Sequence, residues 1–156
     1  MISLLTRVAL CWALGFGPAF ADGYLTPATI TPNSQRVLGQ LRGANFNVTT
    51  DQAIAINATV FQITSIVVTN CSASLTLAVG GFYSAASKGG TPIVAATQVY
   101  SALTASTVLL NPTVAATPLI TRFTVSSVFL SLTTAQGAAA TCDVYIVGID
   151  LTLSGN

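Results

Sequence analysis

The amino-acid sequence predicts an all-β protein, an antiparallel, jelly-roll-like β-sandwich preceded by an irregular N-terminal arm. About eight to ten short runs of β-branched and alternating apolar residues are separated by turn signals, as in sandwiches and barrels. No long amphipathic helices alternate with these runs, which disfavours a parallel α/β sheet, and no repeat of solenoid or propeller period stands out. The chain of 156 residues is long enough for one domain with a sizeable core.

Residues 1–21 have the three parts of a secretory signal peptide. Arg7 precedes an apolar run, and small residues up to Ala21 form the expected cleavage site before Asp22. An uncleaved anchor is one alternative, although the apolar run is shorter than the ~20 residues that a spanning helix needs. A true start downstream of Met1 is another. We expect cleavage after Ala21, which would leave no stable membrane span.

Residues 22–43 are predicted to form the irregular arm. Pro27, Pro32 and Gly39 interrupt any regular pattern in this stretch. The β-sandwich domain is then predicted over residues 44–156.

Residues 59–69 predict a central strand that is apolar on both faces. One face is expected to carry Phe61, Ile63 and Val67, and the other Val60, Ile66 and Val68. A strand of this kind is covered on both sides, by a second layer of the same chain or by another subunit.

The next two features are a strand and an exposed hairpin tip. Leu75, Leu77 and Val79 alternate with smaller or polar residues, which predicts a strand. Lys88, followed by two glycines, indicates a turn in which this lysine is solvated.

Residues 123–153 are expected to form an antiparallel hairpin that turns at residues 133–140. The return segment is apolar at every second position, and we expect that face to be the core: Tyr145, Val147, Ile149, Leu151 and Leu153. The opposite face is expected to meet another subunit. The candidate interface residues are Val144, Ile146, Val60, Ile66 and Val68. Val147→Asp should then unfold the domain, whereas a polar change at Val144 or Ile146 should weaken assembly only.

The composition points to a subunit of an assembly. Charged residues make up only 6% of the chain and apolar residues 52%, against roughly 25% charged in an ordinary soluble domain. Near-zero net charge weakens repulsion between molecules and favours association. The five basic residues form no patch that could hold phosphates, so we expect no nucleic-acid binding.

The sequence nominates no catalytic residue, cofactor site or metal site. Histidine and glutamate are both absent, which removes the commonest general base and metal ligand. Asp143 and Asp150 would lie about 23 Å apart along a strand and cannot act as a pair. Tyr83 and Tyr100 could stack on sugars, but packing in a core or interface is the better expectation for either ring.

Two cysteines, Cys71 and Cys142, remain after removal of residues 1–21. In an oxidising compartment they could form a disulfide that closes a loop of about 70 residues, with a stabilisation of roughly 4 kcal/mol. The alternative is two separate thiols, and the sequence does not choose between these states.

Four stretches between Phe61 and Leu151 carry a resemblance to a known group of proteins. They read ITSIVVTN at residues 63–70, GGFYSAASKGG at 80–90, SLTTAQG at 131–137 and ATCDVYI at 140–146. In these stretches the chain resembles small structural proteins encoded by tailed phages and prophages. The resemblance implies a β-sandwich virion component such as a head-decoration, head-fibre or tail-associated subunit. The export signal departs from that group, because virion proteins assemble in the cytoplasm.

We therefore expect a non-enzymatic structural subunit that forms homo-oligomers and contacts other subunits of a particle or filament. Its expected location is the virion. The alternative is a secreted subunit of a bacterial surface or appendage, with weak glycan binding. The predicted signal peptide and the two cysteines favour this alternative.

Overall fold

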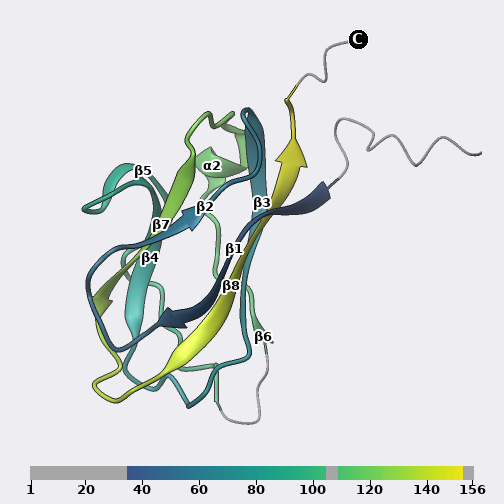
Figure 1. Cartoon of the computed structure of the whole chain (residues 1–156). Helices are drawn as coiled ribbons and strands as arrows, with labels where there is room; N and C mark the ends of the chain where they lie inside the picture. The colour runs from purple at the N-terminus through teal and green to yellow at the C-terminus, as the bar shows by residue number, and fades with distance from the viewer. Residues whose placement is uncertain (1–34, 105–108, 153–156) are drawn as a thin grey trace, which may run out of the picture. The chain divides into compact units, whose positions relative to one another are not determined.

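Two antiparallel four-stranded sheets pack face to face in the computed structural model, which describes residues 35–104 and 109–152 (Figure 1). The elements are β1 (Gln35–Asn45), β2 (Gln52–Ala55), β3 (Phe61–Thr69), β4 (Val79–Ala85), β5 (Gly89–Val94), β6 (Leu109–Leu110), α2 (Ala116–Ile120), β7 (Ser127–Thr134) and β8 (Thr141–Asp150). One sheet has the order β1-β8-β3-β6 and the other β2-β7-β4-β5. The predicted all-β sandwich is confirmed.

The strand order is that of an eight-stranded jelly roll. Strand β1 pairs with β8, β2 with β7, β3 with β6 and β4 with β5, all antiparallel. The chain therefore resembles one long hairpin, bent at the β4–β5 turn and rolled so that alternate pairs fall in different sheets. The pairings of β8 with β3 and of β7 with β4 complete the two sheets.

The core lies between the sheets and follows the two-residue period of the strands. Along β8, buried and partly exposed side chains alternate from Cys142 to Gly148. Large rings fill the space between the sheets. Phe46 packs edge-on against Tyr100 with 5.1 Å between ring centroids, and Phe61 stacks on Phe123 at 5.7 Å.

The first strand occupies part of the chain that the sequence assigned to an irregular arm. Residues 35–43 belong to β1, so the arm prediction is wrong there, whereas residues 1–34, including the predicted signal peptide, lie outside the described residues. Two register shifts interrupt the pairing of β1 with β8, after Val37 and after Leu41. Gly39 lies at the first of them, where a Cβ would approach the carbonyl oxygen of Ala55 to 2.3 Å. Gly39 is a reason in the sequence to expect no regular element here, yet β1 needs this glycine for its close packing against Ala55.

The predicted closing hairpin is also wrong. Strand β7 pairs with β2 and β4, whereas β8 pairs with β1 and β3, so the two strands belong to different sheets. Residues 135–140 cross between the sheets. The Gln136 backbone N–H donates to the carbonyl of Phe46 at 2.8 Å, which ties the crossing to the end of β1.

Residues 75–78 do not form the predicted strand, which begins only at Val79. The side-chain oxygen of Gln136, a buried residue, accepts hydrogen bonds from the N–H groups of Leu77 at 3.0 Å and Ala78 at 3.3 Å. Its amide nitrogen donates to the Thr76 hydroxyl at 3.2 Å. A side chain thus takes the place of a neighbouring strand, which sequence periodicity does not reveal.

The β4–β5 hairpin confirms the tip expected around Lys88. The Gly89 N–H donates to the carbonyl of Ala86 at 3.0 Å and closes the turn. Ser87 and Lys88 both have positive φ, 58° and 57°. This is the geometry of a type I′ turn, which matches the twist of the two strands but is usually formed by Asn and Gly.

Candidate functional site

The residues predicted to form an interface lie mostly in the core. Ile66, Val68, Val144 and Ile146 are all fully buried between the sheets, and Val60 is half-buried just before β3. The predicted assignment of the two faces is therefore reversed on β8.

A β-bulge in β3 explains why its faces were also misassigned. The register with β8 shifts between Ile63 and Ser65. Because side chains alternate with a period of two, one extra residue moves every later side chain to the other face. Phe61 and Ile63 before the bulge, and Ile66 and Val68 after it, consequently all point into the core. Val67, predicted to share a face with Phe61, points outward instead.

The outward side of the β1-β8-β3-β6 sheet carries a cluster of partly exposed apolar side chains, which we call the apolar face. It comprises Val37, Val67, Tyr145, Val147 and Ile149. Val37 lies opposite Val147, and Val67 lies opposite Tyr145 in the strand register. Such cross-strand pairs form one continuous surface. Tyr145, Val147 and Ile149 were expected to be core residues, so the outward face of β8 is the one that the sequence placed inside.

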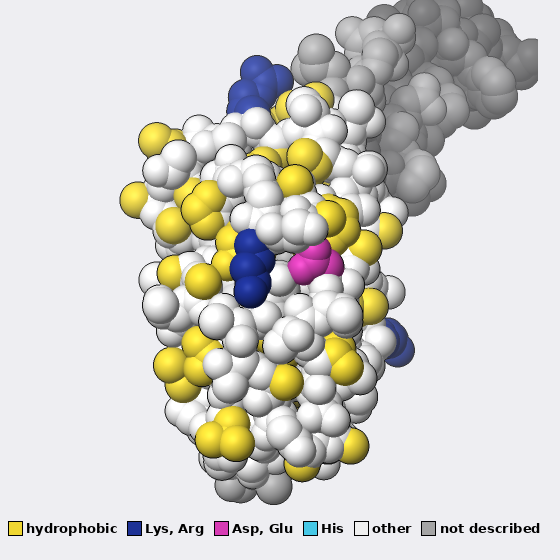
Figure 2. Space-filling model, turned by 90° about the vertical axis from the view of Figure 1, so that its left-hand side faces the viewer, with side chains coloured by type: hydrophobic (Ala, Val, Ile, Leu, Met, Phe, Trp, Pro, Cys, Tyr) yellow, Lys and Arg dark blue, Asp and Glu magenta, His cyan; other side chains and the backbone are white. Residues whose placement is uncertain are grey.

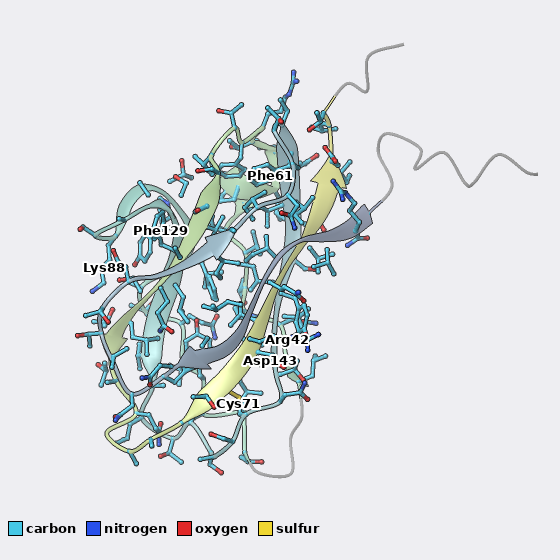
Figure 3. The ribbon with its side chains drawn as sticks, in the orientation of Figure 1. Arg42, Phe61, Cys71, Lys88, Phe129 and Asp143 are labelled. Carbon is cyan, nitrogen blue, oxygen red and sulfur yellow. A yellow bond between two sulfur atoms is a disulfide. The ribbon has the colours of Figure 1, made fainter. Side chains whose placement is uncertain are left out.

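Opposite charges lie at one end of the apolar face. Figure 3 shows Arg42 and Asp143 near each other on β1 and β8. A hydrogen bond from the Asn70 side chain, at 3.1 Å, lowers the pKa of Asp143. The Gly43 N–H, at 3.0 Å, and the charge of Arg42 lower this pKa further.

The other end of this sheet has an ion pair between Arg36 and Asp150. Arg36 also donates to the carbonyl of Asn57 at 3.0 Å. Burial raises the pKa of Asp150, but hydrogen bonds from Thr152 and Arg36 outweigh that effect and lower it. Both ends of the sheet therefore combine a basic and an acidic group.

The two tyrosines considered for sugar stacking are both buried. Tyr100 is fully enclosed, and its hydroxyl donates to the carbonyl of Gly80 at 3.3 Å. Burial raises the pKa of Tyr83, and the nearby charge of Asp51 raises it further. Packing, the better expectation for both rings, is what the structure shows. Phe129, which no sequence pattern singled out, lies opposite Tyr83 on the outward side of the β2-β7-β4-β5 sheet and is more exposed than Tyr83.

Cys71 and Cys142 are joined by a disulfide across the end of the β3–β8 pair (Figure 3). Cys142 is buried on the inner face of β8, whereas Cys71 is half-buried just after β3. The two cysteines are 71 residues apart in the sequence. The disulfide joins the C-terminal end of β3 to the N-terminal end of β8, where the loop that leads to β4 begins.

Two absences hold for the part of the chain that the structure describes. These residues include no group of three or more His, Cys, Asp or Glu side chains placed to hold a metal ion. They also include no helix long and apolar enough to cross a membrane.

Comparison of the chain with family models, curated proteins and solved structures finds no match. The likeness to phage structural proteins therefore stays a prediction from the sequence.

Proposed function

We propose that the protein is a non-enzymatic structural subunit that assembles with copies of itself, as a head-decoration, fibre or tail component of a phage-like virion. The apolar face is the observation that carries this proposal. The five side chains of the apolar face are uncharged and lie on the outside of the sandwich. The most exposed of them is Val37, at 49%. Contiguous exposed apolar surface typically marks a place where another molecule binds.

A second copy of the chain is the partner that best suits this face. Arg42 and Asp143 give one end of the apolar face both a basic and an acidic group. A two-fold axis through the apolar face can therefore place Arg42 of one copy against Asp143 of the other. The chain carries five basic and four acidic residues, so its net charge opposes self-association very little. Two-fold dimers are also the commonest symmetric assemblies.

The fold is compatible with this role but does not select it. Jelly rolls occur in viral capsid proteins and also in lectins. Function therefore has to be argued from surfaces rather than from the architecture. The virion context depends on the sequence resemblance, and neighbouring genes for capsid, portal or tail proteins would support it.

The test is the oligomeric state of the purified chain and of Val147→Asp, measured by size-exclusion chromatography with light scattering at micromolar concentration. Wild type should be an oligomer. Val147→Asp should be a folded monomer, because it places a carboxylate in the centre of the apolar face. Leu77→Asp is the matched control: it also replaces an exposed apolar side chain but lies in the loop before β4. A monomeric wild type, or equal loss of assembly in both variants, would contradict the proposal.

A second candidate function is a secreted subunit of a bacterial surface or appendage. The disulfide between Cys71 and Cys142 favours it, because such bonds persist in oxidising compartments. Intact mass of the native protein distinguishes the two candidates. A mature chain that starts at Asp22 and carries the disulfide supports secretion, whereas a reduced chain that retains Met1 supports assembly in the cytoplasm.

A further inference from the structure

The outward side of the β2-β7-β4-β5 sheet contains two neighbouring hollows. One, of about 350 Å³, is lined by Thr49, Thr50, Asp51, Ser87, Lys88 and Ser131. The other, of about 510 Å³, is lined by hydroxyl and small apolar side chains together with Phe129. Both volumes lie within the range of small-molecule sites, roughly 300 to 1,000 Å³.

The two hollows belong to one surface. Phe129 and Ser131 are two residues apart on β7 and share its outward face, one in each hollow. The end of β4 and the turn after it likewise contribute Ser84 to one hollow and Lys88 to the other. In Figure 3, Lys88 and Phe129 lie on the same side of the sandwich. Figure 2 views the molecule from this side and shows mainly uncharged surface, with basic and acidic side chains adjacent near its centre.

The polar hollow has hydrogen-bonding groups that are held in place. Asp51 accepts hydrogen bonds from the Ser131 side chain and the Ser87 N–H, and both lower its pKa. The carboxylate is thus charged at neutral pH, and each of its two oxygens can accept more than one hydrogen bond. Ser131 is only 1% exposed, so its hydroxyl lies at the base of the hollow.

The turn beside this hollow is held in an unfavourable backbone conformation. Ser87 and Lys88 both adopt left-handed φ values although neither is glycine. Such residues cost about 1 kcal/mol or more each and occur preferentially at functional sites. The bond from Ser87 to Asp51 anchors the turn to the segment before β2.

Phe129 supplies an apolar surface next to these polar groups. Its ring is partly exposed on the outward face of β7. Its neighbour on β2 is the small, exposed Ala53, and its neighbour on β4 is the buried Tyr83. Tyr83 lies on the same outward face as Phe129 but is only 5% exposed, so Phe129 is the more exposed of the two rings.

We propose that this surface binds an uncharged pyranose sugar, with a C–H face of the ring stacked on Phe129 and its hydroxyl groups bonded to Asp51, Ser131 and Lys88. A pyranose sugar has an apolar C–H side that suits Phe129 and hydroxyl groups that suit the polar side chains of the other hollow. Asp51 would repel an anionic ligand and Lys88 a cationic one, so a neutral ligand fits the charge pair best. This site lies on a different sheet from the apolar face, and the inference does not depend on assembly.

The experiment is a titration of the ¹⁵N-labelled full chain, followed by amide chemical shifts. The probes are methyl α-glucoside, methyl α-mannoside, methyl β-galactoside and, as a charged probe, glucuronate. Concentrations up to about 100 mM detect dissociation constants in the millimolar range. At least one neutral sugar should shift the amides of Asp51, Ser87, Phe129 and Ser131.

Phe129→Leu tests the stacking, because leucine keeps an apolar side chain of similar size without the ring. We expect about three- to tenfold weaker binding of the same sugar. Tyr145→Leu is the matched control, since it removes an aromatic ring from the apolar face of the other sheet and should leave sugar binding unchanged.

Four outcomes would overturn the inference. They are no shift with any neutral sugar, binding of glucuronate alone, shifts confined to the apolar face, and equal affinity for wild type and Phe129→Leu. The oligomeric state of wild type and Phe129→Leu, measured in parallel, reports separately on the assembly proposal.

Discussion

The two faces of strand β8 are similarly hydrophobic, but only one of them is covered by the rest of the chain. Val144 and Ile146 on the inner face are fully buried against the second sheet. Tyr145, Val147 and Ile149 on the outer face are only partly buried. Apolar residues on both faces thus identify a strand but do not show which face is covered by the chain itself. The inner face explains stability, and the outer face is the one left available for a partner.

The largest expected effect comes from the inner face. Ile146→Asp places a carboxylate in the core without a partner, which costs at least about 4 kcal/mol and approaches the total stability of a typical domain. We expect an unfolded protein by circular dichroism. Val147→Asp on the outer face should keep the wild-type spectrum and melting temperature within a few degrees. Equal unfolding of both variants would show that the two faces do not differ as described.

Loss of the disulfide should have the next largest effect. It joins Cys142 on the inner face of β8 to Cys71 after β3, and closing a loop of this length contributes roughly 4 kcal/mol in the chain-entropy model. Chemical denaturation with and without reductant measures this contribution. The Cys71→Ser/Cys142→Ser double variant should match reduced wild type and should not respond to reductant. An unchanged midpoint on reduction would contradict the prediction.

Gly148→Ala tests the close approach of β3 to β8 next to the bulge. A Cβ at Gly148 would lie 2.0 Å from the carbonyl oxygen of Gln62, a backbone atom that cannot move aside. We expect a loss of about 3 kcal/mol in the free energy of unfolding. Gly43→Ala is the control: Gly43 has a left-handed φ of 66° but open space around its Cβ position, so about 1 kcal/mol is expected. Equal losses would show that sheet packing at Gly148 is not tight.

The smallest expected effect is the pH dependence due to Asp143 at the end of the apolar face. The pKa of this carboxyl is lower in the folded chain than in the unfolded chain. Its ionised form therefore stabilises the fold at neutral pH, and this contribution is lost as the pH falls below about 4. Because the group is partly exposed and screened by solvent, we expect less than about 1 kcal/mol. Melting temperatures of wild type and Asp143→Asn should differ at pH 7, and the difference should shrink as the pH falls below about 4. A constant difference would contradict the prediction.

Local pattern in the sequence was enough to predict the fold class, the strand at residues 59–69 and the β4–β5 turn. Alternating β-branched residues favour extended backbone wherever they occur, and Lys88 with its following glycines indicates a turn. These features depend on neighbours within a few residues. The candidate sugar site could not be found in this way, because Asp51, Lys88 and Phe129 come from distant segments that share no motif.

What only the tertiary structure decided is which apolar face becomes the core and which strands share a sheet. A single bulge between Ile63 and Ser65 reverses the faces of β3, because the side-chain period is two. Likewise, the crossing at Gln136 sends β7 and β8 into different sheets although adjacent strands commonly form a hairpin. Both outcomes depend on contacts between residues far apart in sequence, which local hydrophobic alternation does not encode.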